Sequence, residues 1–105
     1  MKKITIKGTE YNLKYSIRAL FLFEQATGKR FEITTLTDEY LFLYCLLTTS
    51  NKDKMIKIED LWEEIDENPE VMKVYNELMY EQLNKTKMIE NTEDQEGDSD
   101  VKKKS

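Results

Sequence analysis

The most hydrophobic stretch of the chain runs from Tyr40 to Leu47 and consists of eight consecutive apolar or aromatic residues. A solvent-exposed helix needs a polar side, so this pattern predicts a helix buried on all sides, over residues 38–49. A buried strand is the alternative, because periodicity cannot separate the two in a short apolar run. Helix is favoured by the absence of Val and Ile and by Thr37, an N-cap residue followed by two acidic residues.

Strict alternation of polar and apolar residues predicts a β-hairpin over residues 2–15. The two-residue loop is Gly8-Thr9, with glycine where a type II′ turn needs a positive φ. The register that pairs Lys7 with Glu10 then brings four apolar side chains to one face, which must pack on helices or on another subunit. These side chains are Ile4, Ile6, Tyr11 and Leu13.

A first helix is predicted over residues 17–27, with Ser16 as its N-cap and Gly28 as the residue that closes it. Helical spacing places a mostly apolar set of residues on one face of this helix. That face comprises Ile17, Leu20, Phe21 and Glu24, widened by Ala19, Phe23 and Ala26.

Two amphipathic helices follow the buried one. Residues 58–66 place apolar side chains at i, i+3, i+4 and i+7, with carboxylates on the other side. Asn68-Pro69 supplies an N-cap and a first helical residue for a helix over 69–87. Its apolar stripe comprises Val71, Met72, Tyr75, Leu78, Met79 and Leu83.

These elements predict a single α+β domain over residues 1–89, in which the hairpin packs on a bundle of about four helices. Residues 90–100 contain no apolar side chain and cannot bury enough surface to offset chain entropy. We therefore expect residues 90–105 to form a disordered acidic tail with a basic end.

Charge is unevenly distributed along the chain. Residues 1–30 carry seven basic and two acidic side chains, although the whole chain has a net charge of −5. A basic head and an acidic rear favour oriented encounters with charged partners, including further copies of the chain. The chain has no apolar leader and no stretch long enough to cross a bilayer, so we expect a cytoplasmic protein.

No catalytic signature is present. The chain has no His, so no Ser-His or Cys-His pair can form, and its one cysteine, Cys45, lies inside the buried run. Acidic spacing from Asp66 to Glu77 resembles a calcium loop, but Val71 stands where that loop needs glycine. The sequence predicts no enzyme, no catalytic residue, no metal and no cofactor.

Protein–protein contact is the remaining class of function. The candidate partner-binding residues are Val71, Met72, Tyr75, Met79 and Leu83 on the last helix and Lys3, Lys7 and Lys14 on the hairpin. A simple core role for the methionines is the alternative. The hairpin lysines also suit a small nucleic-acid-associated regulatory protein, because β-ribbons can enter a groove, although the acidity of the chain opposes this hypothesis.

Residues 4–20, which contain the pattern Gly-x-x-Tyr-x-Leu-x-Tyr, and then residues 23–29, Phe-Glu-Gln-Ala-Thr-Gly-Lys, resemble the N-terminal portion of tail assembly chaperones of long-tailed bacteriophages and prophages. The likeness covers about the first fifty residues. It implies a non-enzymatic protein that binds the tape measure protein, helps to recruit tail tube subunits, and is often made in two lengths by frameshifting. The helical body here is shorter than such a role suggests.

Overall fold

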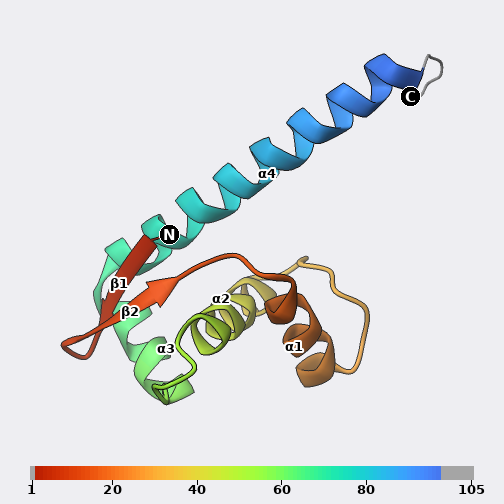
Figure 1. Ribbon diagram of the computed structural model, residues 1–105. Coiled ribbons are helices and arrows are strands. Elements are labelled where there is room, and N and C mark those ends of the chain that lie inside the picture. The colour runs from red at the N-terminus through yellow and green to blue at the C-terminus, as the bar shows by residue number, and fades with distance from the viewer. Residues whose placement is uncertain (1, 98–105) are drawn as a thin grey trace.

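The computed structural model describes residues 2–97, with side chains described through residue 85. In chain order the elements are β1 (Lys2–Ile6), β2 (Thr9–Leu13), α1 (Ile17–Thr27), α2 (Leu36–Ser50), α3 (Ile58–Glu67) and α4 (Pro69–Gly97), as Figure 1 shows. A two-stranded antiparallel hairpin followed by four helices confirms the predicted α+β fold class. None of the described helices has both the length and the apolar content that a membrane span needs.

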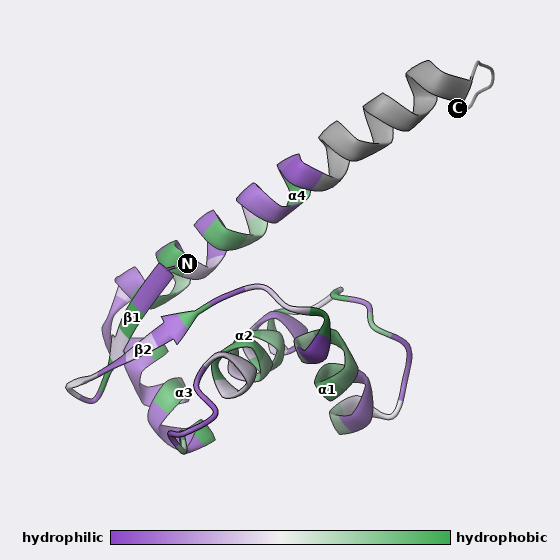
Figure 2. Cartoon of the chain, in the orientation of Figure 1, coloured by the Kyte–Doolittle hydropathy of each residue, from purple (hydrophilic) through white to green (hydrophobic). Residues whose placement is uncertain are grey.

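Helix α2 forms the centre of the core. Phe42, Leu43, Leu46 and Leu47 are fully buried, and α2 packs against α1, β2 and α3. Figure 2 shows hydrophobic residues in α2, with more polar residues toward the ends of the helix. The prediction of a buried central helix is confirmed, and the buried strand is excluded.

The start of α2 differs from the prediction. The N-cap is Thr35, whose hydroxyl accepts a hydrogen bond from the Asp38 backbone N–H at 3.1 Å. The Asp38 carboxylate accepts one from the Thr35 backbone N–H at 3.3 Å. Predicting Thr37 as the cap was wrong, because only Thr35 has an acidic residue three positions later to complete a capping box.

The hairpin turn also lies one residue earlier than predicted. Ile4 pairs with Tyr11 and Ile6 pairs with Thr9, which leaves Lys7 and Gly8 as the loop. Both loop residues have positive φ, 51° and 82°, as a type I′ turn requires. The predicted Gly8-Thr9 loop and the pairing of Lys7 with Glu10 were therefore wrong.

The hairpin nevertheless buries the predicted face. Moving the loop by one residue shifts the register by two, and an even shift leaves each side chain on the same side of the sheet. The four apolar residues predicted for that face are all buried in the core: Ile4, Ile6, Tyr11 and Leu13.

Two helix starts and one helix end follow the sequence signals. The Ser16 hydroxyl accepts a hydrogen bond from the Ala19 N–H at 3.3 Å, and Gly28 closes α1 with a φ of 73°. At the start of α4, the Asn68 side-chain oxygen accepts one from the Glu70 N–H at 3.0 Å. The predicted caps Ser16, Gly28 and Asn68 are thus confirmed.

The buried face of α1 is rotated relative to the prediction. Ala19 and Phe23 are fully buried, whereas Ile17 is 63% exposed and Phe21 is 56% exposed. The Phe23 ring packs edge-on against Phe31, with centroids 5.2 Å apart. This aromatic contact accompanies the packing of α1 on α2, and the buried part of the helix is centred on Ala19 and Phe23 and leaves Ile17 and Phe21 exposed.

Helix α4 packs on β1 and α3 and then leaves the rest of the fold (Figure 1). Its backbone is helical to Gly97, further than the predicted end at residue 87. Residues 88–96 contain no Gly or Pro, so no helix breaker interrupts them before Gly97. The helix overlaps the first part of the predicted disordered tail, and residues 98–105 lie outside the described residues.

Candidate functional site

The apolar stripe of α4, predicted to bind a partner, mostly faces the core. Val71 and Tyr75 are each only 1% exposed, and Met72 and Met79 are partly buried against the core. Leu83 is 51% exposed. Of these five residues, Leu83 alone offers a largely exposed apolar side chain, and the alternative of a core role for the methionines fits their packing.

The three lysines predicted as binding residues have different surroundings. Lys3 Nζ lies 3.7 Å from the Glu10 carboxylate, and Lys7 Nζ lies 2.6 Å from that of Glu63. The Glu63 carboxylate raises the pKa of Lys7. Lys14 follows β2 and lines a groove to which neither Lys3 nor Lys7 contributes. Two of the three lysines are therefore paired with carboxylates of the same molecule.

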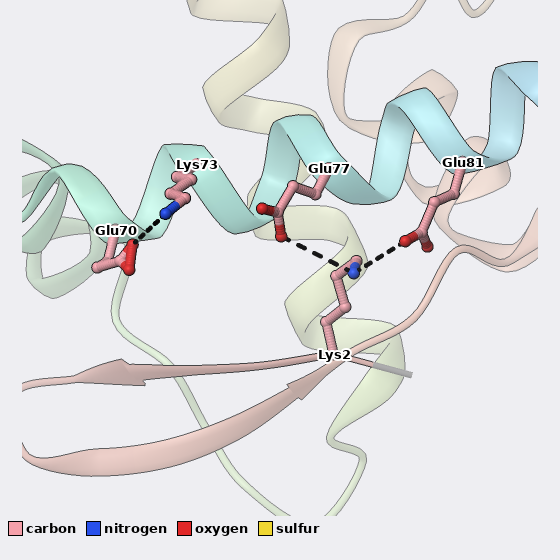
Figure 3. Close-up of polar contacts among 5 residues, drawn as sticks. All are labelled: Lys2, Glu70, Lys73, Glu77 and Glu81. Carbon is pink, nitrogen blue, oxygen red and sulfur yellow. Dashed lines mark ion pairs between the residues drawn. The ribbon is translucent and has the colours of Figure 1, made fainter.

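A further lysine ties β1 to α4. Lys2 Nζ lies 3.0 Å from Glu81 and 3.9 Å from Glu77, and Figure 3 shows it between these two carboxylates. On the same helix Lys73 pairs with Glu70 at 3.9 Å. Such exposed pairs add little stability, and α4 also packs directly on β1.

An open groove of about 300 Å³ lies between α2 and α3. The rings of Tyr40 and Trp62 stand side by side in it, with centroids 6.2 Å apart and planes tilted by 50°. Both side chains are half-buried, so each presents part of its ring to solvent. The groove is lined by Thr37, Tyr40, Trp62, Ile65 and Asp66, and we call it the aromatic groove.

The two helices that line the aromatic groove are anchored by contacts with the rest of the fold. The Tyr44 hydroxyl donates a hydrogen bond to the Ile56 carbonyl at 2.9 Å, which fixes the loop before α3. Leu61, near the start of α3, is fully buried. The groove residues are therefore carried on two helices whose relative position is fixed by buried contacts.

The sequence pattern did not predict the aromatic groove. In the sequence, Tyr40 belongs to the apolar run, and Trp62 is one of the apolar positions of the predicted helix over residues 58–66. A signal was present, because Trp is large and is rarely fully buried. Trp62 is also flanked by carboxylates at positions 59, 60, 63 and 64.

A second groove, of about 560 Å³, lies where β2 leads into α1 beside the end of α2. Three of its lining residues are cationic, and no carboxylate lines it among the described residues. We call it the basic groove. It is lined by Lys14, Ser16, Ile17, Arg18, Thr49, Ser50 and Lys52.

The core contains one thiol. Cys45 is 1% exposed, and its burial raises its pKa to about 11. Among the residues that the structure describes, no group of His, Cys, Asp or Glu side chains is arranged to hold a metal ion. No family model, curated protein or solved structure matches the chain. The two grooves and the resemblance of residues 4–29 are the observations that bear on function.

Proposed function

We propose that this protein is a tail assembly chaperone of a long-tailed bacteriophage or prophage. It acts without chemistry, in the cytoplasm of the bacterial host, by binding a helical segment of the tape measure protein and assisting assembly of the tail tube. The resemblance of residues 4–29 supports the class of protein, and the aromatic groove supports the mode of binding.

The aromatic groove carries this proposal. Tyr and Trp dominate binding energy at interfaces, because each buries a large rigid surface at a small cost in side-chain entropy. A helix that lies in such a groove inserts apolar side chains spaced at i, i+3 or i+4. Tyr40 and Trp62, side by side on α2 and α3, suit one such anchor.

The charges of α3 indicate what should flank that anchor. Asp66 lines the groove itself. An occupant with Lys or Arg on the turns beside its apolar anchor would complement this helix, and tape measure segments of this composition are the expected ligands. The carboxylates of α3 are Glu59, Asp60, Glu63, Glu64, Asp66 and Glu67.

A nucleic-acid-associated regulatory role has less support. It requires free cations on the hairpin, whereas Lys3 and Lys7 each lie within ion-pair distance of a carboxylate. Lys14 remains as the hairpin cation directed at the basic groove.

The test is binding of the tape measure protein encoded beside this chain. Trp62 is the only Trp, so its fluorescence reports on the groove directly, and burial by a helix should shift its emission to shorter wavelength. Co-expression should also increase the soluble yield of the tape measure protein. No emission shift and no gain in soluble yield would contradict the proposal.

A groove variant localises the effect. Thr37 is exposed and lines the groove, so Thr37→Arg blocks the groove without opening the core, and we expect binding about tenfold weaker. Met55→Arg adds the same charge at a residue that is 93% exposed and does not line the groove, and it should bind normally. Equal loss in both variants would show a charge effect and not a groove.

A further inference from the structure

The basic groove concentrates positive charge that the fold does not neutralise. Among the side chains described, through residue 85, no ion pair involves Lys14, Arg18 or Lys52. Arg18 lies in the first turn of α1, which contains no acidic residue. The Arg18 side chain therefore adds its positive charge to that of the N-terminal end of the helix dipole. An external anionic group would stabilise this arrangement.

The walls of the basic groove are fixed by hydrogen bonds. The Lys14 N–H donates to the Ser50 hydroxyl at 3.0 Å, and that hydroxyl lies 3.2 Å from the Lys14 carbonyl, to which it donates. The hydroxyls of Ser16 and Thr49 lie 3.3 Å apart and share a hydrogen bond. The backbone carrying the cations is thus preorganised, which lowers the entropy cost of binding.

The same chain contains a segment of complementary charge. Residues 90–100 carry six carboxylates and no basic residue. The acidic residues are Glu90, Glu93, Asp94, Glu96, Asp98 and Asp100. A segment that places carboxylates at spacings of three and four residues can contact several cations along one groove.

The groove of the same molecule is an unsuitable site for this segment. Helix α4 is continuous from Pro69 to Gly97, and it leaves the body of the fold after crossing β1 (Figure 1). Each further residue advances the helix by about 1.5 Å, so residues 90–97 are carried away from the basic groove. Another molecule can present the segment without any change in α4.

We propose that the basic groove binds the acidic segment 90–100 of a second copy of this chain. The contact is head-to-tail, so one molecule offers its groove and its neighbour offers its segment, and successive copies form a chain or a closed ring. The inference does not depend on the proposed chaperone function, because it concerns a different surface and a different partner.

Charge exchange tests the contact with the full-length chain. The groove variant carries Lys14→Glu, Arg18→Glu and Lys52→Glu, and the segment variant carries Glu93→Lys, Asp94→Lys and Glu96→Lys. Light scattering after size exclusion should show wild-type assemblies that grow with protein concentration and dissociate at high salt. Each variant alone should associate at least about tenfold more weakly, since two or three ion pairs become repulsive.

Mixing the two variants should restore association, because the acidic groove of one then meets the basic segment of the other. A matched control with Lys29→Glu, Arg30→Glu and Lys57→Glu makes the same charge change outside the groove and should associate like the wild type. Circular dichroism should confirm that each variant folds, and the segment variant changes no residue of the described core.

Zero-length cross-linking identifies the partner. In a mixture of ¹⁵N-labelled and unlabelled protein, Lys52 should link to Glu93 or Asp94 of the other isotope. Links only within one isotope, or a wild type that stays monomeric at every concentration, would overturn the proposal. So would a wild-type monomer whose groove binds a poly-dT oligonucleotide and loses that binding in the groove variant, because the ligand would then be nucleic acid.

Discussion

The side chain of Asn51 pairs with the backbone of Asn12 as a neighbouring β-strand would. Its Oδ1 accepts a hydrogen bond from the Asn12 N–H at 2.9 Å, and its Nδ2 donates one to the Asn12 carbonyl at 2.8 Å. The same Nδ2 donates to the Leu47 carbonyl at 2.8 Å. Asn51 is 4% exposed, so one buried amide joins the hairpin to the end of α2.

The first prediction concerns this amide. Asn51→Asp keeps the shape but removes the donor and places a carboxylate against two carbonyl oxygens. The free energy of unfolding at pH 7 should fall by about 3 kcal/mol, because buried carbonyls lose their partner and a charge is buried. Urea denaturation measures the change. Asn76→Asp, an exposed change on α4, is the control and should alter stability little.

If Asn51→Asp were no more destabilising than Asn76→Asp, the amide would not be the link between hairpin and helix. Loss of the contact between Asn51 and Asn12 would also affect the basic groove, because the neighbouring hydrogen bond between Lys14 and Ser50 joins the same two segments.

The second prediction compares two tyrosine hydroxyls. The Tyr75 hydroxyl is buried and has no hydrogen-bond partner among the described residues, and burial raises its pKa. Tyr75→Phe removes an unsatisfied group, so the free energy of unfolding should rise by about 1 kcal/mol. Tyr44→Phe is the matched control: it deletes the bond to the Ile56 carbonyl and should lower that free energy by about 1 kcal/mol.

Thermal and urea unfolding of the two variants gives the comparison directly. Equal losses in Tyr75→Phe and Tyr44→Phe would mean that the Tyr75 hydroxyl is satisfied, for example by an ordered water.

Much of the fold could be predicted from sequence because the signals were local and redundant. The run from Tyr40 to Leu47 has no polar side and so indicated a buried element. Asn68 before Pro69 marked the start of a helix. The face of the hairpin was also recoverable, since the parity of the apolar positions survives a register error of two residues.

The errors arose where tertiary contacts override local preference. Lys7 occupies a left-handed conformation, with φ at 51°, that propensity would assign to Gly or Asn. Its N–H donates to the Glu64 carboxylate at 3.0 Å, and its ammonium pairs with Glu63. These partners lie more than fifty residues away, so no local pattern could reveal the turn.

The candidate sites were hard to predict for a related reason. Each groove is assembled from residues that look like core or like ordinary surface when considered separately. Tyr40 and Trp62 come from different helices, and Lys14 and Lys52 are brought together by long-range contacts such as those of Asn12 with Asn51 and of Lys14 with Ser50. Charge patterning indicated association but could not show which surfaces meet.

The last prediction is the pH dependence of stability. Hydrogen bonds from the Thr34 backbone N–H, the Thr34 hydroxyl and the Thr35 N–H lower the pKa of Asp38 below its ordinary value of 3.8. Bonds from the Lys7 N–H and the Asn68 amide lower the pKa of Glu64 below 4.5. A carboxyl with a lowered folded-state pKa stabilises the fold above its unfolded-state pKa, and this contribution is lost as pH falls through the folded-state value.

We therefore expect the free energy of unfolding to be constant near neutral pH and to decline below about pH 4.5. Asp38→Asn and Glu64→Gln should each lower stability at pH 7 and reduce the decline at acid pH, because each removes a carboxyl that contributes to it. Glu59→Gln, an exposed change on α3, is the control and should leave the decline as it is. Urea denaturation at a series of pH values measures all four proteins, and an unaltered acid slope in both Asp38→Asn and Glu64→Gln would assign the pH dependence to other groups.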